Sequence, residues 1–141
     1  MTGSVFVDTS ALYALFNPRD SNHAAASGFL RSLHAQGTEL LTTNLVELEA
    51  YVLVHARMGR LGLLRFRKIV GSSHWLSRHK VTTVQEAAAW TLLERERDKE
   101  YSFVDASSFV VMRAQRVTRA FAFDIHFQQA GFQKLSSANV H

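Results

Sequence analysis

Four carboxylates stand where the local pattern of the chain predicts an inward-facing side chain: Asp8, Glu49, Asp105 and Asp124. Three of them directly follow a short apolar run, and the fourth falls on the apolar side of a predicted helix. A buried carboxylate is costly unless it is paired, neutralised or bound to a metal ion. Because no obvious set of basic partners stands beside these acids, they predict a site for a divalent cation.

The chemistry of such a site follows from its ligands. Two carboxylates about 4 Å apart repel each other by roughly 4 kcal/mol at an effective dielectric of 20, so clustered acids must share protons, find arginines or hold a cation. Ligands that are all oxygen select hard ions such as Mg²⁺ or Mn²⁺ over Zn²⁺. One or two such ions can supply a hydroxide nucleophile and offset the charge of a phosphate under attack. The residues therefore favour metal-assisted hydrolysis of a phosphodiester.

No other local motif offers competing chemistry. The chain has no Gly-rich phosphate loop, no GxSxG sequence and no cysteine nucleophile. Its seven histidines show no HxxxH or similar ligand spacing, and each is better explained as an ordinary surface or core residue. His126 is the one of interest, because it follows Asp124 by two residues.

Composition places the chain among globular proteins. Its 141 residues, 47% apolar and 20% charged, fit one domain spanning residues 1–141. The absence of cysteine excludes disulfides and thiolate metal sites and is compatible with a reducing cytosol. No basic segment precedes Asp8, and no apolar run reaches membrane-spanning length. We therefore expect a cytoplasmic protein with no membrane partner.

Positive charge is concentrated in two parts of the chain. The net charge is +4 and the isoelectric point is near 9.9, which modestly favours a polyanionic partner. The cations are Arg57, Arg60, Arg65, Arg67, Lys68, Arg78 and Lys80 in the middle, and Arg113, Arg116 and Arg119 later. For any single one of these cations, a position on a solvated helix face is as good an explanation as contact with a polyanion. Together they would draw phosphates toward an acidic pocket, as a metal-dependent nuclease requires.

The elements that position the acids alternate along the chain. Short apolar runs predict strands at Val5–Asp8, Glu39–Thr42, Val81–Val84, Arg119–Phe123 and, at the sheet edge, Phe132–Leu135. Helix-like segments are Ser10–Phe16, Ser21–Gln36, Asn44–Met58, Leu61–Val70, Gln85–Lys99 and Asp105–Arg116. This alternation predicts an α/β fold with a mostly parallel central sheet of about five strands flanked by helices. Ligands of such folds bind at the carboxyl ends of the strands, where Asp8 and Asp124 are predicted.

Helical periodicity distinguishes two neighbouring glutamates. With Leu45 at zero and 100° per residue, Leu48 lies at about 300° and Val52 at about 340°. Glu49 then lies at about 40°, within this apolar stripe, whereas Glu47 lies near 200° on the opposite side. The pattern predicts that Glu49 is the buried acid and Glu47 the solvent-facing one.

The same construction places Asp105 in line with Phe109 and Met112 on the inner face of its helix. Asp105 also falls in the first turn of that helix, where the helix dipole favours an anion. Asn44 is a plausible N-cap for the third helical segment and Gly59 a plausible stop. The region Gly71–His79, which includes Trp75, receives no role from the sequence.

Four blocks of the sequence resemble the PIN-domain family in order and in spacing. They are Val5-Phe6-Val7-Asp8-Thr9-Ser10-Ala11-Leu12, Thr42-Thr43-Asn44-Leu45-Val46-Glu47-Leu48-Glu49, Tyr101-Ser102-Phe103-Val104-Asp105-Ala106, and Ala122-Phe123-Asp124-Ile125-His126-Phe127 with Gly131-Phe132. The resemblance runs from about residue 4 to residue 135. The size of the chain and its last block are similar to VapC-type toxins of bacterial and archaeal toxin–antitoxin pairs. Ile125 departs from the pattern, since relatives often have arginine there.

This resemblance implies a Mg²⁺- or Mn²⁺-dependent endoribonuclease that inhibits translation by cleaving RNA. Asp8, Glu49, Asp105 and Asp124 would then be the catalytic and metal-binding set. Thr9 or Ser10 would support the site, and Ser102 would lie nearby.

The resemblance also implies a homodimer and a small antitoxin whose tail lies in an apolar groove. Candidate groove residues are Leu12, Tyr13, Leu15, Phe16, Phe29 and Leu30, although each is more simply explained as core.

Two other readings compete with the nuclease. A catalytically silent RNA-binding module of the same fold is one, but a silent relative would be expected to have lost an acid. A phospho-acceptor receiver domain is the other, but it would need paired acids near the first strand end and a late lysine. Here Asp8 is followed by Thr9-Ser10, and Lys134 lies ten residues beyond Asp124. The sequence leaves open which RNA is cleaved and whether one or two ions bind.

Overall fold

The structure is a computed structural model that describes residues 3–136. Its strands are β1 (Val5–Val7), β2 (Leu40–Thr43), β3 (Leu76–His79), β4 (Arg119–Phe121) and β5 (Gln133–Leu135). Its helices are α1 (Thr9–Phe16), α2 (His23–Ala35), α3 (Asn44–Ile69), α4 (Thr83–Arg95), α5 (Phe103–Ala114) and α6 (His126–Gln129). No helix within these residues is both long and apolar enough to cross a membrane.

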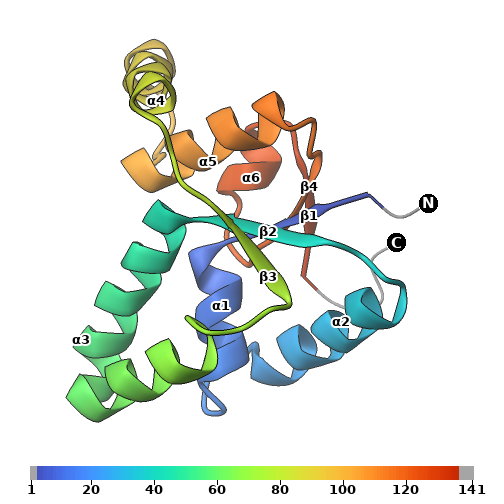
Figure 1. Ribbon diagram of the computed structural model, residues 1–141. Coiled ribbons are helices and arrows are strands. Elements are labelled where there is room, and N and C mark those ends of the chain that lie inside the picture. The colour runs from blue at the N-terminus through green and yellow to red at the C-terminus, as the bar shows by residue number, and fades with distance from the viewer. Residues whose placement is uncertain (1–2, 137–141) are drawn as a thin grey trace.

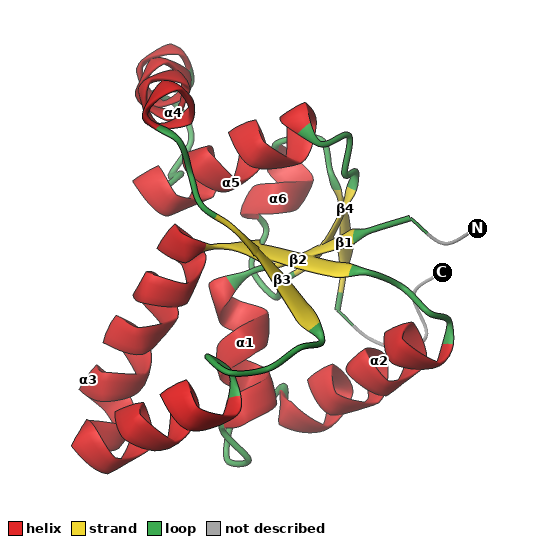
Figure 2. Ribbon diagram, in the orientation of Figure 1, coloured by secondary structure: helices red, strands yellow, loops and turns green. Residues whose placement is uncertain are grey.

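The strands form one parallel sheet in the order β3-β2-β1-β4-β5. Helices α1 and α2 lie on one side of it and α5 and α6 on the other, while α4 packs against α5 (Figure 1, Figure 2). The predicted α/β architecture with a mostly parallel sheet of about five strands is therefore confirmed. Because β1 is central, the residue that follows it lies in the middle of the carboxyl edge.

Aromatic side chains fill the core on both sides of the sheet. Phe127 is fully buried, with its ring centroid 5.9 Å from that of Phe6 and 5.1 Å from that of Phe109. Phe29 of α2 meets Phe121 of β4 edge to face, at 5.0 Å between centroids. Burial of such rings is the main source of stability in a domain of this size. Phe127 also fixes the short helix α6, which the sequence pattern did not predict.

The third strand is not where the apolar pattern indicated. The prediction of a strand at Val81–Val84 is wrong, because β3 is Leu76–His79 and α4 begins at Thr83. In β3 only the Leu76 side chain is fully buried, since this strand lies at the edge of the sheet. A polar sequence therefore forms a strand that an apolar-run criterion overlooks. Thr82 starts α4 through a reciprocal capping box with Gln85.

Helix α3 bends at Gly59, where φ is 73° and ψ is −174°. A positive φ is readily accessible to glycine, so the two predicted segments meet at this residue as one bent helix. The prediction of Asn44 as N-cap is wrong, because the Thr43 hydroxyl accepts the Val46 N–H instead. The Asn44 side chain accepts a hydrogen bond from the Val81 N–H at 2.8 Å and so fixes the segment after β3.

Arg78 gives the previously unassigned region a structural role. Its Nε lies 2.6 Å from Oε2 of Glu47 on α3, and its terminal nitrogens donate to the carbonyl groups of Val70, Ser73 and Leu76. This side chain is 24% exposed and that of Glu47 is 14% exposed. One guanidinium thus joins the start of α3, the end of α3 and the loop before β3.

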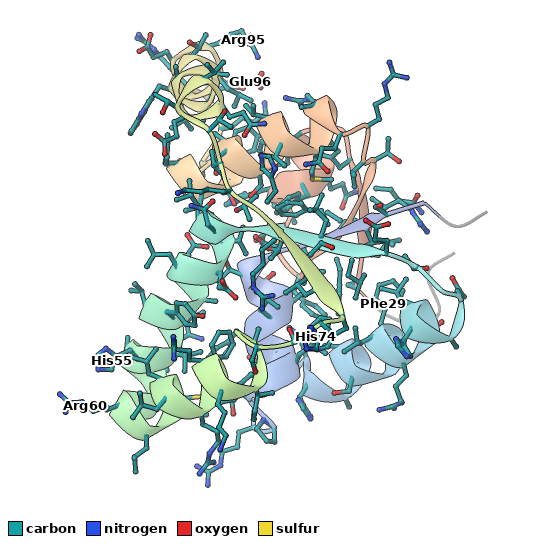
Figure 3. All side chains as sticks on the ribbon, viewed as in Figure 1. Phe29, His55, Arg60, His74, Arg95 and Glu96 are labelled. Carbon is teal, nitrogen blue, oxygen red and sulfur yellow. The ribbon has the colours of Figure 1, made fainter. Side chains whose placement is uncertain are left out.

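We predict that Arg78→Ala lowers the free energy of unfolding by about 2 kcal/mol, because Glu47 and several carbonyl groups lose a charged donor. Urea unfolding of the metal-free protein measures this change. Arg60→Ala is the matched control, since Arg60 is exposed at the bend of α3 and points away from the fold (Figure 3). Equal stability of the two variants would contradict the role given to Arg78.

Candidate metal centre

Asp8 lies directly after β1 and caps the first turn of α1. Asp8 is only 3% exposed. Its Oδ2 accepts hydrogen bonds from the Ser10 N–H at 3.4 Å and from the Ser10 hydroxyl at 3.0 Å. Ser10 Oγ in turn accepts the Phe123 N–H at 3.0 Å. This serine therefore links the carboxylate at the end of β1 to the segment that carries Asp124.

Asp105 is the third residue of α5, and it forms a capping box with Ser102. The Ser102 N–H donates to Asp105 Oδ2 at 2.9 Å, and the Asp105 N–H donates to Ser102 Oγ at 3.0 Å. Asp105, Phe109 and Met112 are all buried, as the helical pattern predicted. The capping box fixes the carboxylate at the positive end of the helix, where an anion is favoured.

Asp124 lies in the loop between β4 and α6, three residues after the strand ends. Its Oδ1 accepts the backbone N–H of His126 at 3.0 Å. The imidazole Nδ1 of His126 lies 2.7 Å from Oδ2 of Asp105. One potential ligand atom from each of Asp105, Asp124 and His126 lies within 4.8 Å of the others.

Glu49 joins the site through Thr9, whose hydroxyl donates to its Oε1 at 2.6 Å. It is half-buried rather than fully buried. The prediction that Glu47 faces solvent is wrong, because Glu47 is only 14% exposed and pairs with Arg78. The apolar stripe behind that prediction is itself exposed, at 56% for Leu48 and 62% for Val52.

The buried side of α3 is formed instead by Val46, Ala50 and Val54. Apolar residues occupy more than one side of this helix, so periodicity alone selected the wrong stripe. Glu49, rather than Glu47, lies beside Thr9 and the other acids, but it is not the more buried of the two, so the reason given for choosing it fails.

Electrostatics connects all four acids. Burial, followed by the charges of Asp124 and Asp105, raises the pKa of Asp8 well above its usual range. Burial also raises the pKa of Glu49, with further increases from Asp105 and Asp124, while the Thr9 hydroxyl opposes them. Asp105 and Asp124 therefore lie close enough to Asp8 and Glu49 to oppose the ionisation of those two acids.

A divalent cation fits this arrangement. Its charge would relieve the repulsion that raises the pKa of Asp8, and the four carboxylates supply the oxygen donors that Mg²⁺ and Mn²⁺ prefer. Asp8, Asp105 and Asp124 converge from β1, α5 and the loop after β4, with Glu49 beside them on α3. The cluster can thus hold a hard cation at the carboxyl edge of the sheet.

Sequence reasoning gave His126 no place in this set, although it singled the residue out. The available signal was its position two residues after Asp124. What the sequence could not indicate was the contact with Asp105, which lies 21 residues earlier on another helix.

The fold and the site together define a known class of protein. The family model of the PIN domain matches residues 5–133, so the chain belongs to the PIN-domain family.

Within this family, the chain is similar to known VapC-type toxins. Over 133 residues the chain is 38% identical to the 23S rRNA-specific endonuclease VapC20 of two Mycobacterium tuberculosis strains, covering 91% of this chain and 95% of the relative. It is also similar to the crystal structure of M. tuberculosis VapC20, a sarcin-ricin loop cleaving toxin. That match has a TM-score of 0.83 and 37% identity, and covers 94% of this chain and 99% of the other. The resemblance to VapC-type toxins is therefore confirmed.

A more distant match shows the fold alone. PAE2754 from Pyrobaculum aerophilum is 20% identical, with a TM-score of 0.64 and coverage of 95% of this chain and 90% of the other.

We predict that Asp8→Asn raises the melting temperature of the metal-free protein at pH 7. The raised pKa of Asp8 means that the native state binds a proton more readily than the unfolded chain does. Ionised Asp8 therefore lowers the free energy of unfolding as the pH rises above 3.8, the ordinary pKa of an aspartate. Asparagine removes the charge and can still accept the Ser10 N–H. The gain should shrink as the pH falls toward that value, as thermal melts across a pH series will measure.

With Mg²⁺ present, the wild type should have the higher melting temperature of the two, because Mg²⁺ stabilises only a native state that binds it. That stabilisation is about 2.7 kcal/mol when the Mg²⁺ concentration is 100 times its Kd. Glu94→Gln, an exposed substitution on α4, is the control for removing one negative charge. A destabilised Asp8→Asn protein at pH 7 without metal would contradict the repulsion described here.

Proposed function

We propose that this chain is a Mg²⁺- or Mn²⁺-dependent endoribonuclease, the toxin of a type II toxin–antitoxin pair, acting in the cytoplasm to inhibit translation. The observation that carries the proposal is the convergence of Asp8, Glu49, Asp105 and Asp124, from four separate elements, on one electrostatically linked site. The likeness to an endonuclease toxin over nearly the whole chain supports it. Residues 1–141 are proposed to act as a single PIN-like unit.

The four acids would hold the cation, which when bound would offset charge on the scissile phosphodiester and activate a water molecule. Ser10 and Thr9 keep the carboxylates of Asp8 and Glu49 oriented through the hydrogen bonds described above. Ser102 does the same for Asp105 through its backbone N–H. Because these donors lie at the starts of α1 and α5, we infer that the acids are oriented before the substrate binds.

Ribosomal RNA is the first substrate to test. The relative at 38% identity is specific for 23S rRNA, and we propose that this chain also cleaves a loop of ribosomal RNA. Sequence-specific proteins usually recognise RNA in loops, where unpaired bases are accessible. The net charge of +4 favours this polyanion, since each cation near a phosphate releases counterions.

An apolar groove of about 530 Å³ offers a place for the antitoxin. Its lining comes from α1, α2, the second half of α3 and the loop before β3, and includes Leu12, Leu15, Phe16, Leu30, Met58, Ile69 and Trp75. Four of the six candidate groove residues named from the sequence line it, whereas Tyr13 and Phe29 belong to the buried core. Arg31 and Arg65 also line the groove, so the proposed antitoxin segment combines apolar and acidic residues.

A homodimer is the second assembly that we propose. Leu48 and Val52 on α3 and Val84 and Trp90 on α4 are large apolar side chains left more than half exposed. Exposed apolar residues of this size commonly lie in protein interfaces. They belong to α3 and α4, both of which contact α5, whose first turn carries Asp105.

We predict that the purified chain cleaves 23S rRNA with Mg²⁺ or Mn²⁺ and not with EDTA. Asp105→Asn and Glu49→Gln should each reduce the rate by more than about 100-fold, beyond the usual cost of changing an outer-sphere residue. Single-turnover cleavage of a panel of ribosomal, transfer and messenger RNAs measures this.

Glu47→Gln is the informative comparison. It should lower the melting temperature, because Arg78 loses its partner, yet leave metal-dependent cleavage measurable at temperatures where the variant is folded. Full cleavage activity in the Asp105→Asn variant would contradict the assignment of the metal centre. Binding of RNA without any cleavage by the wild type would instead favour the catalytically silent RNA-binding module.

We predict that Leu30→Arg prevents formation of the antitoxin complex while leaving RNA cleavage intact, because the cation projects into the apolar groove. Co-expression with the small protein encoded beside the toxin, followed by size-exclusion chromatography, tests this. Arg19→Ala, an exposed change outside the groove lining, is the control. A stable complex with the Leu30→Arg variant would rule out this groove as the binding site.

A further inference from the structure

His126 contacts two carboxylates of the metal centre at once, with two different groups. Its imidazole Nδ1 lies 2.7 Å from Oδ2 of Asp105 on α5, and its backbone N–H donates to Oδ1 of Asp124 at 3.0 Å. The other polar contacts of these acids are local, such as the hydrogen bond from the Ser102 N–H to Asp105. His126 is therefore the residue that connects the acid of α5 with the acid of the loop after β4.

The imidazole is held from other directions as well. The Tyr101 ring meets it edge to face, with centroids 5.9 Å apart and planes at 79°. The next residue, Phe127, is fully buried against Phe6 and Phe109 and fixes the start of α6. The core thus fixes the backbone next to His126, and the Tyr101 ring packs against its imidazole.

Asp105 Oδ2 accepts two hydrogen bonds from different directions, one from the Ser102 N–H and one from His126. An ionised carboxylate has no hydrogen to donate, so the hydrogen between the two side chains belongs to Nδ1. Two donors on one oxygen restrict the rotation of the carboxylate about its χ2 bond more than a single donor does. A carboxylate fixed in this way loses less conformational freedom when it binds a cation.

We propose that His126 is a positioning residue of the metal centre, whose Nδ1–H orients the carboxylate of Asp105 while its backbone N–H orients that of Asp124. The inference rests on the proposed metal centre but not on the identity of the RNA. It gives the side chain of His126 a role distinct from that of a ligand, because the ring acts through Asp105.

Substitutions that move the donor test this role. In His126→Asn the amide nitrogen lies close to the position of Nδ1, so the hydrogen bond to Asp105 is retained. In His126→Gln the amide reaches toward the position of Nε2 instead, and His126→Ala has no donor. All three keep the backbone N–H that contacts Asp124.

The readout is the affinity for Mn²⁺ alone, measured by calorimetry and by the EPR signal of the free ion, in the absence of RNA. We expect His126→Asn to bind Mn²⁺ nearly as tightly as the wild type. His126→Ala and His126→Gln should bind it about 10- to 100-fold more weakly, the usual effect of losing an outer-sphere partner. Gln128→Ala, an exposed change on the same helix, is the control and should match the wild type.

Three results would overturn the proposal. Restoration by glutamine but not by asparagine would mean that His126 acts through Nε2. Equal Mn²⁺ affinity in all variants would mean that the contact with Asp105 does nothing for the cation. Weakening in proportion to the fall in melting temperature, with no advantage for asparagine, would mean that the ring serves only packing.

The same experiment separates this inference from the nuclease assignment. A wild-type chain that binds Mn²⁺ and cleaves no RNA would contradict the proposed function and leave the role of His126 standing. A wild-type chain that binds no Mn²⁺ would overturn the metal centre, and the role of His126 with it.

Discussion

The carboxylates of Asp8, Asp105 and Asp124 repel one another at the carboxyl edge of the sheet, and the burial of Asp8 strengthens that repulsion. The surrounding elements offset this cost with short-range donors. Backbone N–H groups and hydroxyls at the starts of α1 and α5 donate to the acids, and the Thr9 hydroxyl donates to Glu49. A parallel sheet suits the task because its strands end at one edge and lead into helix N-termini, where anions are favoured.

A single turn of helix α3 carries one glutamate that stabilises the fold and another that faces the acidic cluster. Glu47 faces Arg78, which holds together the two ends of the helix and the loop before β3. Glu49, two residues later, faces Thr9 and the other acids. Because successive helical residues point about 100° apart, two acids so close in sequence serve different surroundings. Arg78 pairs with the first, and the second adds its carboxylate to the acidic cluster.

The molecule also leaves apolar surface where nothing within residues 3–136 covers it. The groove is lined by α1, α2 and the second half of α3, whereas Leu48 and Val52 lie on the first half of α3 and Val84 and Trp90 on α4. Apolar area in contact with water favours association, so two separate surfaces suit two kinds of partner. This division accounts for the helical pattern that misled the sequence reasoning, because Leu48 and Val52 have the periodicity of a core stripe without being part of the core.

The amino-acid sequence by itself determined the α/β alternation, the strand end that carries Asp8, the strand that precedes the loop of Asp124, and the inner face that carries Asp105. These features depend on local periodicity and on apolar runs, which are properties of neighbouring residues. Only the tertiary structure decided that β3 is a polar edge strand, that Glu47 pairs with Arg78 and that His126 meets Asp105. Each of these depends on residues more than 20 positions apart or on sheet order, and no local pattern encodes such a contact.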